Sequence, residues 1–412
     1  MLTTIACLLL GYWVDRARRQ QAAVRWVEEN GGTVRYDFEY DEEGDYVFGA
    51  TSPVPELATS FLSVDYFARV HAVDFEIEQN AKNLVHDISP LANLAELQFL
   101  DLGGMYVHDL TPLSTLTELR RLGLDSTPVD NLTPLSTLEQ LQTLDLCNSL
   151  VSDLTALRGL KRLKYLRLEA TPVRDLTPLA GLTNLMGLNL SFTAVSDLTP
   201  LANLRSLQSL SILDAPVRDL TPLRNLKQLE SLEASHTAIS DLGPLSGLDQ
   251  LHRLCAVGTA VDDLAPLAHM KNLSNLELDY CPVSDLSPLS SVESLISLSV
   301  SNTQVQDLKP LATLVNLECL DISQTKVSKL QPLKNLYRLE MFDTQVSDLT
   351  PLVGSELGRL SLSGEKLRDL TPIVELKRLS FLHLKPSNAP REQLKMIGSA
   401  LPNCYVHESS TR

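Results

Sequence analysis

The chain has 412 residues and a formal net charge of −16, with 44% hydrophobic and only 5% aromatic residues. Binding to nucleic acid needs a surplus of Lys and Arg, so this acidity argues against a nucleic-acid partner. The six cysteines include no C-x-x-C pair, which argues against a thiolate metal site and for free thiols in a reducing compartment. They are Cys7, Cys147, Cys255, Cys281, Cys319 and Cys404.

An apolar segment opens the chain. Residues 1–14 carry no charged side chain, and Arg16, Arg18 and Arg19 follow. Fourteen helical residues span about 21 Å, less than a hydrocarbon core of about 30 Å. We interpret the segment as a membrane anchor, a shortened transmembrane helix, with a signal-like segment as the alternative. The arginines then predict a cytoplasmic repeat region; the alternative is a secreted or cell-surface protein.

Residues 15–86 are predicted to form a helix followed by an N-terminal cap, which shields the first open core edge of a repeat protein. The polar pattern, the alternation of apolar and polar residues and the turn residues predict its elements. These are a helix over Arg16–Glu29, a strand over Thr33–Tyr40 with a hairpin partner at Tyr46–Phe48, a short helix over Ser60–Val70 and a strand over His71–Glu78.

A 22-residue period runs through residues 87–389 and defines fourteen units. Twelve anchor residues lie 22 positions apart, and two more follow after steps of 19 and 21. The shortened unit before Asp348 lacks about one helical turn, yet its leucines keep their register. Such a period indicates a solenoid of stacked coils. The anchors are Asp87, Asp109, Asn131, Asp153, Asp175, Asp197, Asp219, Asp241, Asp263, Asp285, Asp307, Lys329, Asp348 and Asp369.

Residues 197–218 represent one unit. Four leucines from Leu198 to Leu207 are spaced three apart, which is typical of a helical or 3₁₀ turn. Leu210 and Ile212 are spaced two apart, as in a strand. One unit therefore contains one tight helical turn and one short strand.

Three columns of the repeat have structural explanations. The anchor Asp fits a helix N-cap, and Lys329 does not. Pro, as at Pro200, fits the first helical turn, where no intrahelical N–H partner is lost. A Thr follows the strand in eight units, and we expect its hydroxyl to bond backbone groups of the next coil. These residues are Thr127, Thr171, Thr193, Thr237, Thr259, Thr303, Thr325 and Thr344.

Residues 390–412 are predicted to be a C-terminal cap and tail, with an amphipathic helix over Pro390–Leu401 and a strand over Cys404–His407. Cys404 and His407 point to opposite faces of such a strand, so they do not form a catalytic pair. His86 and His108 lie one period apart, but a third metal ligand is missing. We therefore predict no enzyme activity, no cofactor and no metal.

The repeat resembles the bacterial internalin-type leucine-rich repeat. The residues that match its 22-residue unit are Leu207, Leu210, Ile212, Val217, Asp219, Leu220, Pro222 and Leu223, with Thr in place of the family's ladder Asn. The resemblance covers about residues 73–407. It implies an α/β solenoid: a right-handed leucine-rich-repeat horseshoe with a parallel β-sheet on the concave face and 3₁₀ or helical turns on the convex face.

The resemblance also implies protein binding on the concave face. We predict a monomeric scaffold for protein–protein interaction. The alternative is a regulatory subunit, or a secreted effector or adhesin, that acts on a partner enzyme or a host receptor. An enzyme-linked role needs a catalytic domain outside the repeats, and the sequence shows no motif for one.

The predicted contact surface is a stripe of apolar and aromatic residues at one edge of the sheet, since interface centres favour such residues with a polar rim. The stripe contains Phe192, Leu213, His236, Val257 and Tyr280, with Glu233, Glu277 and Asp279 beside it. A second candidate is the charged group Arg121, Asp125, Tyr165, Arg167 and Glu169.

Overall fold

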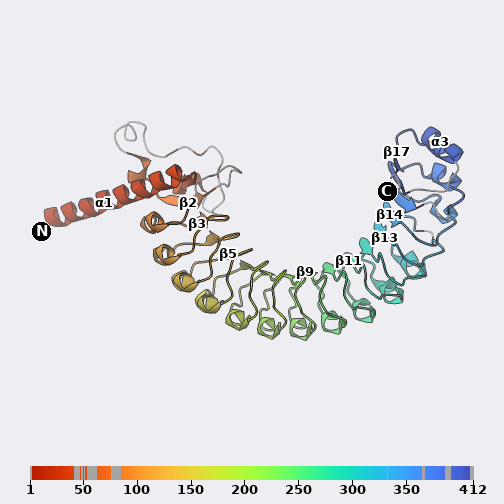
Figure 1. Cartoon of the computed structure of the whole chain (residues 1–412), viewed down its shortest axis with the longest axis horizontal. Helices are drawn as coiled ribbons and strands as arrows, with labels where there is room; N and C mark the ends of the chain where they lie inside the picture. Colours follow the sequence, from red (N-terminus) through yellow and green to blue (C-terminus); the bar gives the residue numbers. More distant parts are fainter. Residues whose placement is uncertain are drawn as a thin grey trace. The chain divides into compact units, whose positions relative to one another are not determined.

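The structure, a computed structural model, describes residues 2–40, 47, 50, 52, 63–75, 85–331, 333–363, 367–385 and 391–408. Two compact units divide the chain, Met1–Val195 and Ser196–Arg412. In both, each regular coil contributes one short strand and one 3₁₀ turn. Within each unit the strands line the inner edge and the 3₁₀ turns line the outer edge (Figure 1). The predicted leucine-rich-repeat solenoid is thereby confirmed.

The first unit opens with helix α1 (Leu2–Glu29), and its described residues include seven strands. The strands are β1 (Thr33–Tyr36), β2 (Val70–Asp74), β3 (Phe99–Asp101), β4 (Arg121–Gly123), β5 (Thr143–Asp145), β6 (Tyr165–Arg167) and β7 (Gly187–Asn189). The 3₁₀ turns are η1 (Asp37–Glu39), η2 (Val64–Tyr66), η3 (Ser89–Asn93), η4 (Thr111–Thr115), η5 (Thr133–Thr137), η6 (Thr155–Gly159) and η7 (Thr177–Leu179).

The second unit continues the same alternation and ends with a helix and a last strand. Its strands are β8 (Ser209–Ser211), β9 (Ser231–Glu233), β10 (Arg253–Cys255), β11 (Asn275–Glu277), β12 (Ser297–Ser299), β13 (Cys319–Asp321), β14 (Arg338–Met341), β15 (Arg359–Ser363), β16 (Phe381–Lys385) and β17 (Tyr405–Glu408). Its 3₁₀ turns are η8 (Thr199–Leu201), η9 (Thr221–Leu223), η10 (Gly243–Leu245), η11 (Ala265–Leu267), η12 (Ser287–Ser291), η13 (Lys309–Thr313), η14 (Thr350–Leu352) and η15 (Thr371–Glu375). The helix is α3 (Arg391–Ala400).

The strands of successive coils pair in parallel with equivalent residues opposite each other. Leu254, for example, lies opposite Leu232 on one side and Leu276 on the other. All three side chains are fully buried. The core is therefore a stack of leucine layers, in which each coil buries its apolar side chains only against its neighbours.

The N-terminal cap differs from the prediction in two respects. Strand β1 ends at Tyr36 and pairs antiparallel with β2, so it covers the open edge of the sheet as native proteins commonly do. Tyr46 and Phe48, the predicted hairpin partner, lie outside the described residues. Where a short helix was predicted over Ser60–Val70, the described part forms only the 3₁₀ turn η2.

Helix α1 begins well before the predicted start at Arg16 and is continuous with the apolar segment. The helix packs on the cap from Trp13 onward: the amide of Gln20 donates to the carbonyl of Ala68 at 2.9 Å, and the Trp13 ring contacts Tyr66 edge-on at 5.8 Å. Among the described residues, no helix has both the length and the apolar composition needed to cross a membrane. The predicted transmembrane helix is thus not supported.

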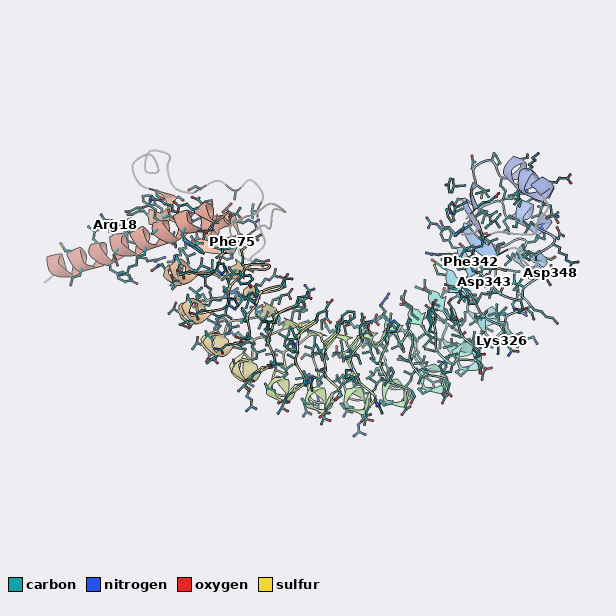
Figure 2. The ribbon with its side chains drawn as sticks, in the orientation of Figure 1. Arg18, Phe75, Lys326, Phe342, Asp343 and Asp348 are labelled. Atoms are coloured by element: carbon teal, nitrogen blue, oxygen red, sulfur yellow. The ribbon has the colours of Figure 1, made fainter. Side chains whose placement is uncertain are left out.

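The anchor side chains bond the start of each 3₁₀ turn as predicted, but from one residue before the N-cap, which is the following residue, as Leu220 is after Asp219. At thirteen of the fourteen anchors the side-chain oxygen accepts the backbone N–H two residues later, as Asp219 accepts from Thr221 at 2.8 Å. Lys329 is the exception, and in its shortened unit the described residues form no 3₁₀ turn between β13 and β14. Leu320 still lies opposite Leu339, so the register survives the deletion. In Figure 2 the anchor Asp348 lies on the side of the 3₁₀ turns, whereas Phe342 lies on the side of the strands.

The threonine column requires a correction. Each hydroxyl donates to the carbonyl three residues earlier in its own coil, as Thr259 does to Ala256 at 2.7 Å, and not to a backbone group of the next coil. Thr259 also contacts the next coil through the Cys281 thiol at 3.3 Å. The same bond occurs at the other seven threonines. The buried hydroxyl satisfies a carbonyl where the chain leaves the strand and turns.

Acid is expected to destabilise the fold through the anchor column. Hydrogen bonds from the Thr221 hydroxyl and backbone N–H lower the pKa of Asp219, and seven other anchors show the same direction. A lowered folded-state pKa contributes stability that is complete above the unfolded value of about 3.9. This stability is lost as the pH falls through the folded-state pKa values, which denaturant midpoints measured from pH 7 down to pH 3 will show.

The matched control replaces several of these aspartates by Asn, as Asn131 already does naturally at the same position. Asn keeps the acceptor but does not titrate, so the variant should lose less stability between pH 5 and pH 3 than the wild type. If the free energy of unfolding depends on pH in the same way in both proteins, the anchor aspartates do not cause the loss of stability in acid.

Candidate protein-binding surface

Side chains on the strands alternate between the core and the exposed face of the sheet. In β9, Leu232 is buried, while Ser231 and Glu233 are half-buried on the exposed face. The next residue on the same face as Glu233 is Ser235, and there the chain leaves the sheet. Each coil thus places three outward positions on the sheet, some of them buried as Ser235 is, followed by one position at the rim.

The rim residue has a left-handed backbone. Its N–H still continues the ladder, as the N–H of Tyr280 donates to the carbonyl of Ser301 at 2.9 Å. Asn, Asp and Gly are the residues that adopt this conformation most readily. The rim residues are Gly104, Ser126, Asn148, Ala170, Phe192, Asp214, His236, Gly258, Tyr280, Asn302, Gln324 and Asp343, with φ between 54° and 68°.

Phe192 and Tyr280 are the two bulky aromatic residues in this column. Their φ values are 57° and 60°, and their side chains are 51% and 64% exposed. A left-handed conformation costs an L-residue roughly 1–2 kcal/mol, and an exposed ring recovers little of this by packing. Backbone strain that persists without a packing gain is a reason to suspect a functional role.

The five residues of the predicted stripe therefore occupy two neighbouring positions of the repeat. Phe192, in the first unit, and His236 and Tyr280, in the second, are rim residues. Leu213 and Val257 come one residue before the rim and are half-buried on the sheet face. The His236 ring lies over the next coil, where an added Cβ at Gly258 would meet its Nδ1 at 2.7 Å.

Three carboxylates and one guanidinium lie on the sheet face of the second unit beside these residues. Arg253 pairs with Glu277 at 2.8 Å. Glu233 accepts the backbone N–H of Ser235 at 3.0 Å. Asp279 accepts from the Ser301 N–H at 2.6 Å, yet burial raises its pKa. All three predicted polar neighbours of the stripe therefore lie on the sheet face, each held by a hydrogen bond or an ion pair.

The second predicted group lies on the sheet face of the first unit, but its members have separate partners. Arg167 pairs with Asp145 at 2.7 Å, Glu169 accepts from the Asn189 amide at 2.9 Å, and the Tyr165 ring lies over Gly187. Arg121 lies over the Phe99 ring, 5.4 Å from its centroid. Of the five residues, Arg121 and Asp125 line one hollow of the sheet face.

Sequence reasoning missed a hollow on the sheet face of the first unit. Its volume is about 450 Å³, and Tyr40, Phe99, Asp101, Arg121 and Asp125 are among its lining residues. The sequence contained a signal for it. Gly123 occupies the repeat position that Asp101 and Asp145 occupy in the two neighbouring coils, and a glycine leaves a gap in that row of side chains. Tyr40 was not predictable, since it comes from the cap and not from the repeat.

A second missed cluster lies on the last strands of the second unit. The Phe381 and Tyr405 rings stack at 5.9 Å, and the His383 and His407 rings approach to 4.8 Å. Burial, followed by the charge of His407, lowers the pKa of His383. The signal was the strand register, which places Phe381 opposite Tyr405.

The residues considered for chemistry do not assemble into a reactive site. His86 and His108 flank the Tyr106 ring at 5.1 and 5.3 Å. Across the described ranges, no group of three or more His, Cys, Asp or Glu side chains could hold a metal ion. Burial raises the pKa of Cys404, which is opposite to the activation of a nucleophilic thiol.

Comparisons with known proteins agree on the repeat. A family model described as a leucine-rich repeat region matches residues 75–331, more than half of the chain. A search of curated proteins gives no match. Among solved structures, an internalin from Listeria monocytogenes, internalin F, is 27% identical with a TM-score of 0.64, over 76% of this chain and 86% of its own.

Two further solved structures show the fold alone. A leucine-rich-repeat protein of Leptospira interrogans is 22% identical with a TM-score of 0.71, over 81% of this chain and 95% of its own. A plant peptide hormone receptor is 15% identical with a TM-score of 0.53, over 78% of this chain and 73% of its own. The family model and the internalin together confirm the resemblance to internalin-type leucine-rich repeats.

Proposed function

The chain belongs to the leucine-rich-repeat family, and on that premise we propose that it is a non-enzymatic scaffold that binds a partner protein. Proteins of this fold commonly recognise other proteins or peptides, and one of the similar structures is a peptide hormone receptor. The proposed contact surface on the second unit consists of Leu213, His236, Val257 and Tyr280. Phe192 is the proposed contact residue of the first unit.

The observation that carries this proposal is the strained rim. Phe192 and Tyr280 keep large exposed rings where the backbone favours Asn, Asp or Gly. Aromatic residues are the usual anchors of protein interfaces. Glu233, Glu277 and Asp279 supply the polar surround that interfaces place around such anchors.

The test uses the full chain as bait for affinity capture from the source cells, followed by mass spectrometry. The partner recovered is then titrated against the wild type and against a triple variant, Phe192→Ala with Leu213→Ser and Tyr280→Ala. Truncating one anchor typically costs about 2 kcal/mol, which corresponds to about a thirtyfold weaker dissociation constant. We therefore expect the triple variant to bind at least about thirtyfold more weakly.

The control variant carries Leu150→Ala and Val315→Ala, which truncate exposed apolar side chains outside the proposed surface. It should bind as the wild type does. If the triple variant retains full affinity, with circular dichroism showing an intact fold, the proposed surface is wrong. Failure of the wild-type bait to enrich any protein over an unrelated bait would count against the scaffold function itself.

A further inference from the structure

The hollow on the first unit has a definable cause in the sequence. Gly123 lies opposite Asp101 on one side and Asp145 on the other. A Cβ at Gly123 would collide with the Asp101 carboxylate. The missing side chain therefore opens a space of about 450 Å³ on the sheet face, within the range of volumes in which proteins bind small groups.

The wall of the hollow is aromatic. The Tyr40 and Phe99 rings stack at 5.9 Å with nearly parallel planes. The guanidinium of Arg121 already lies over Phe99, so the wall accommodates a basic side chain of this same chain. An apolar wall of this kind suits the methylene stem of a Lys or Arg side chain.

The charge of the hollow is negative. Four carboxylates line it, from Asp74, Asp101, Asp125 and Asp145, against the guanidiniums of Arg35 and Arg121. Asp145 is paired with Arg167, outside this lining. Burial, and then the charges of Asp145 and Asp101, raise the pKa of Asp125. A cation placed near Asp101 and Asp125 would relieve this repulsion.

We propose that the hollow receives a basic side chain, a guanidinium or an ammonium group, from a protein partner. The stem lies against Tyr40 and Phe99, and the charged head lies between the carboxylates of Asp101 and Asp125. This inference rests on the proposed function for the nature of the partner, but it assigns a separate contact on the first unit. The net charge of −16 also favours a partner with basic side chains, because opposite charges attract.

The probe is a short peptide, acetyl-Gly-Arg-Gly-amide, titrated into the full chain and followed by calorimetry or NMR at low salt. Its counterpart has citrulline in place of arginine, which keeps the shape and removes the charge. We expect millimolar binding of the arginine peptide, weakening with salt, and at least about tenfold weaker binding of the citrulline peptide.

The variant Asp101→Asn with Asp125→Asn should weaken arginine-peptide binding at least about tenfold. Asn at 101 can still accept the backbone N–H of Gly103, so the turn is kept. The control, Glu139→Gln with Glu293→Gln, makes the same change in net charge at two exposed sites and should bind as the wild type does. Equal binding of arginine and citrulline peptides, an unaffected Asp variant, or tighter binding of a glutamate peptide would each overturn the proposal.

The outcome is separable from that of the proposed function. The triple variant at Phe192, Leu213 and Tyr280 leaves the hollow unchanged, so it should bind the arginine peptide as the wild type does. If the peptide binds but no protein is captured, the scaffold function fails and the site stands. If a partner is captured and the arginine peptide does not bind, the site fails and the scaffold function stands.

Discussion

Leu254→Ala is expected to lower the free energy of unfolding by about 2 to 5 kcal/mol, the usual cost of truncating a buried leucine. The side chain is fully buried, and its strand is paired on both sides, with Leu232 and Leu276 as direct neighbours. Ladder hydrogen bonds fix the spacing of the three coils, so they cannot close around the cavity. The cost should therefore lie towards the upper end of the range.

The measurement is urea unfolding together with hydrogen exchange. Because each coil contacts only its neighbours, protection should fall most for the N–H groups that bond across β9, β10 and β11, such as Ala234 N–H to the Cys255 carbonyl. His252→Ala, at the exposed residue two positions earlier, is the control and should change stability by less than about 0.5 kcal/mol. A loss below about 1 kcal/mol for Leu254→Ala would show that the coils do relax.

The regular part of the fold was predictable because it depends on spacing alone. Leucines three apart followed by leucines two apart specify one 3₁₀ turn and one strand, and the Asp anchors specify where each turn begins. These features are local to one coil and recur together in thirteen of the fourteen units, as far as the described residues show. Even the shortened unit kept its register, because Leu320 and Leu339 preserve the apolar pattern across the deletion.

The remainder depends on contacts between residues far apart in sequence. The antiparallel pairing of β1 with β2 joins residues such as Val34 and Val73, and it covers the open edge of the sheet. The threonine hydroxyls bond a carbonyl of their own coil, and this choice depends on the turn geometry, which the sequence pattern does not show. The hollow needed Tyr40 from the cap beside Phe99 from the first coils.

The candidate surface was predictable in composition but not in geometry. An unusual run of aromatic and apolar residues identified Phe192, Leu213, His236, Val257 and Tyr280. A period of 22 places Leu213 and Val257 one residue before the column of Phe192, His236 and Tyr280, yet the sequence does not reveal that the rim is left-handed. That feature arises because the rim N–H must reach the next coil while the chain leaves the sheet, and it changes the expected effect of substitution at these positions.

Tyr280→Asn is expected to raise the free energy of unfolding by about 1–2 kcal/mol, because Asn tolerates the left-handed conformation that Tyr adopts at a cost. The reciprocal change, Asn148→Tyr at the same repeat position, should lower it by a similar amount. Both side chains are exposed, so the two effects report backbone strain and not lost packing. Denaturant midpoints of the two variants and the wild type provide the measurement.

If Tyr280→Asn destabilises the protein, the ring contributes more packing than its 64% exposure suggests, and the strain argument fails. If the variant is more stable and also binds the captured partner more weakly, Tyr280 is retained for recognition at the expense of stability.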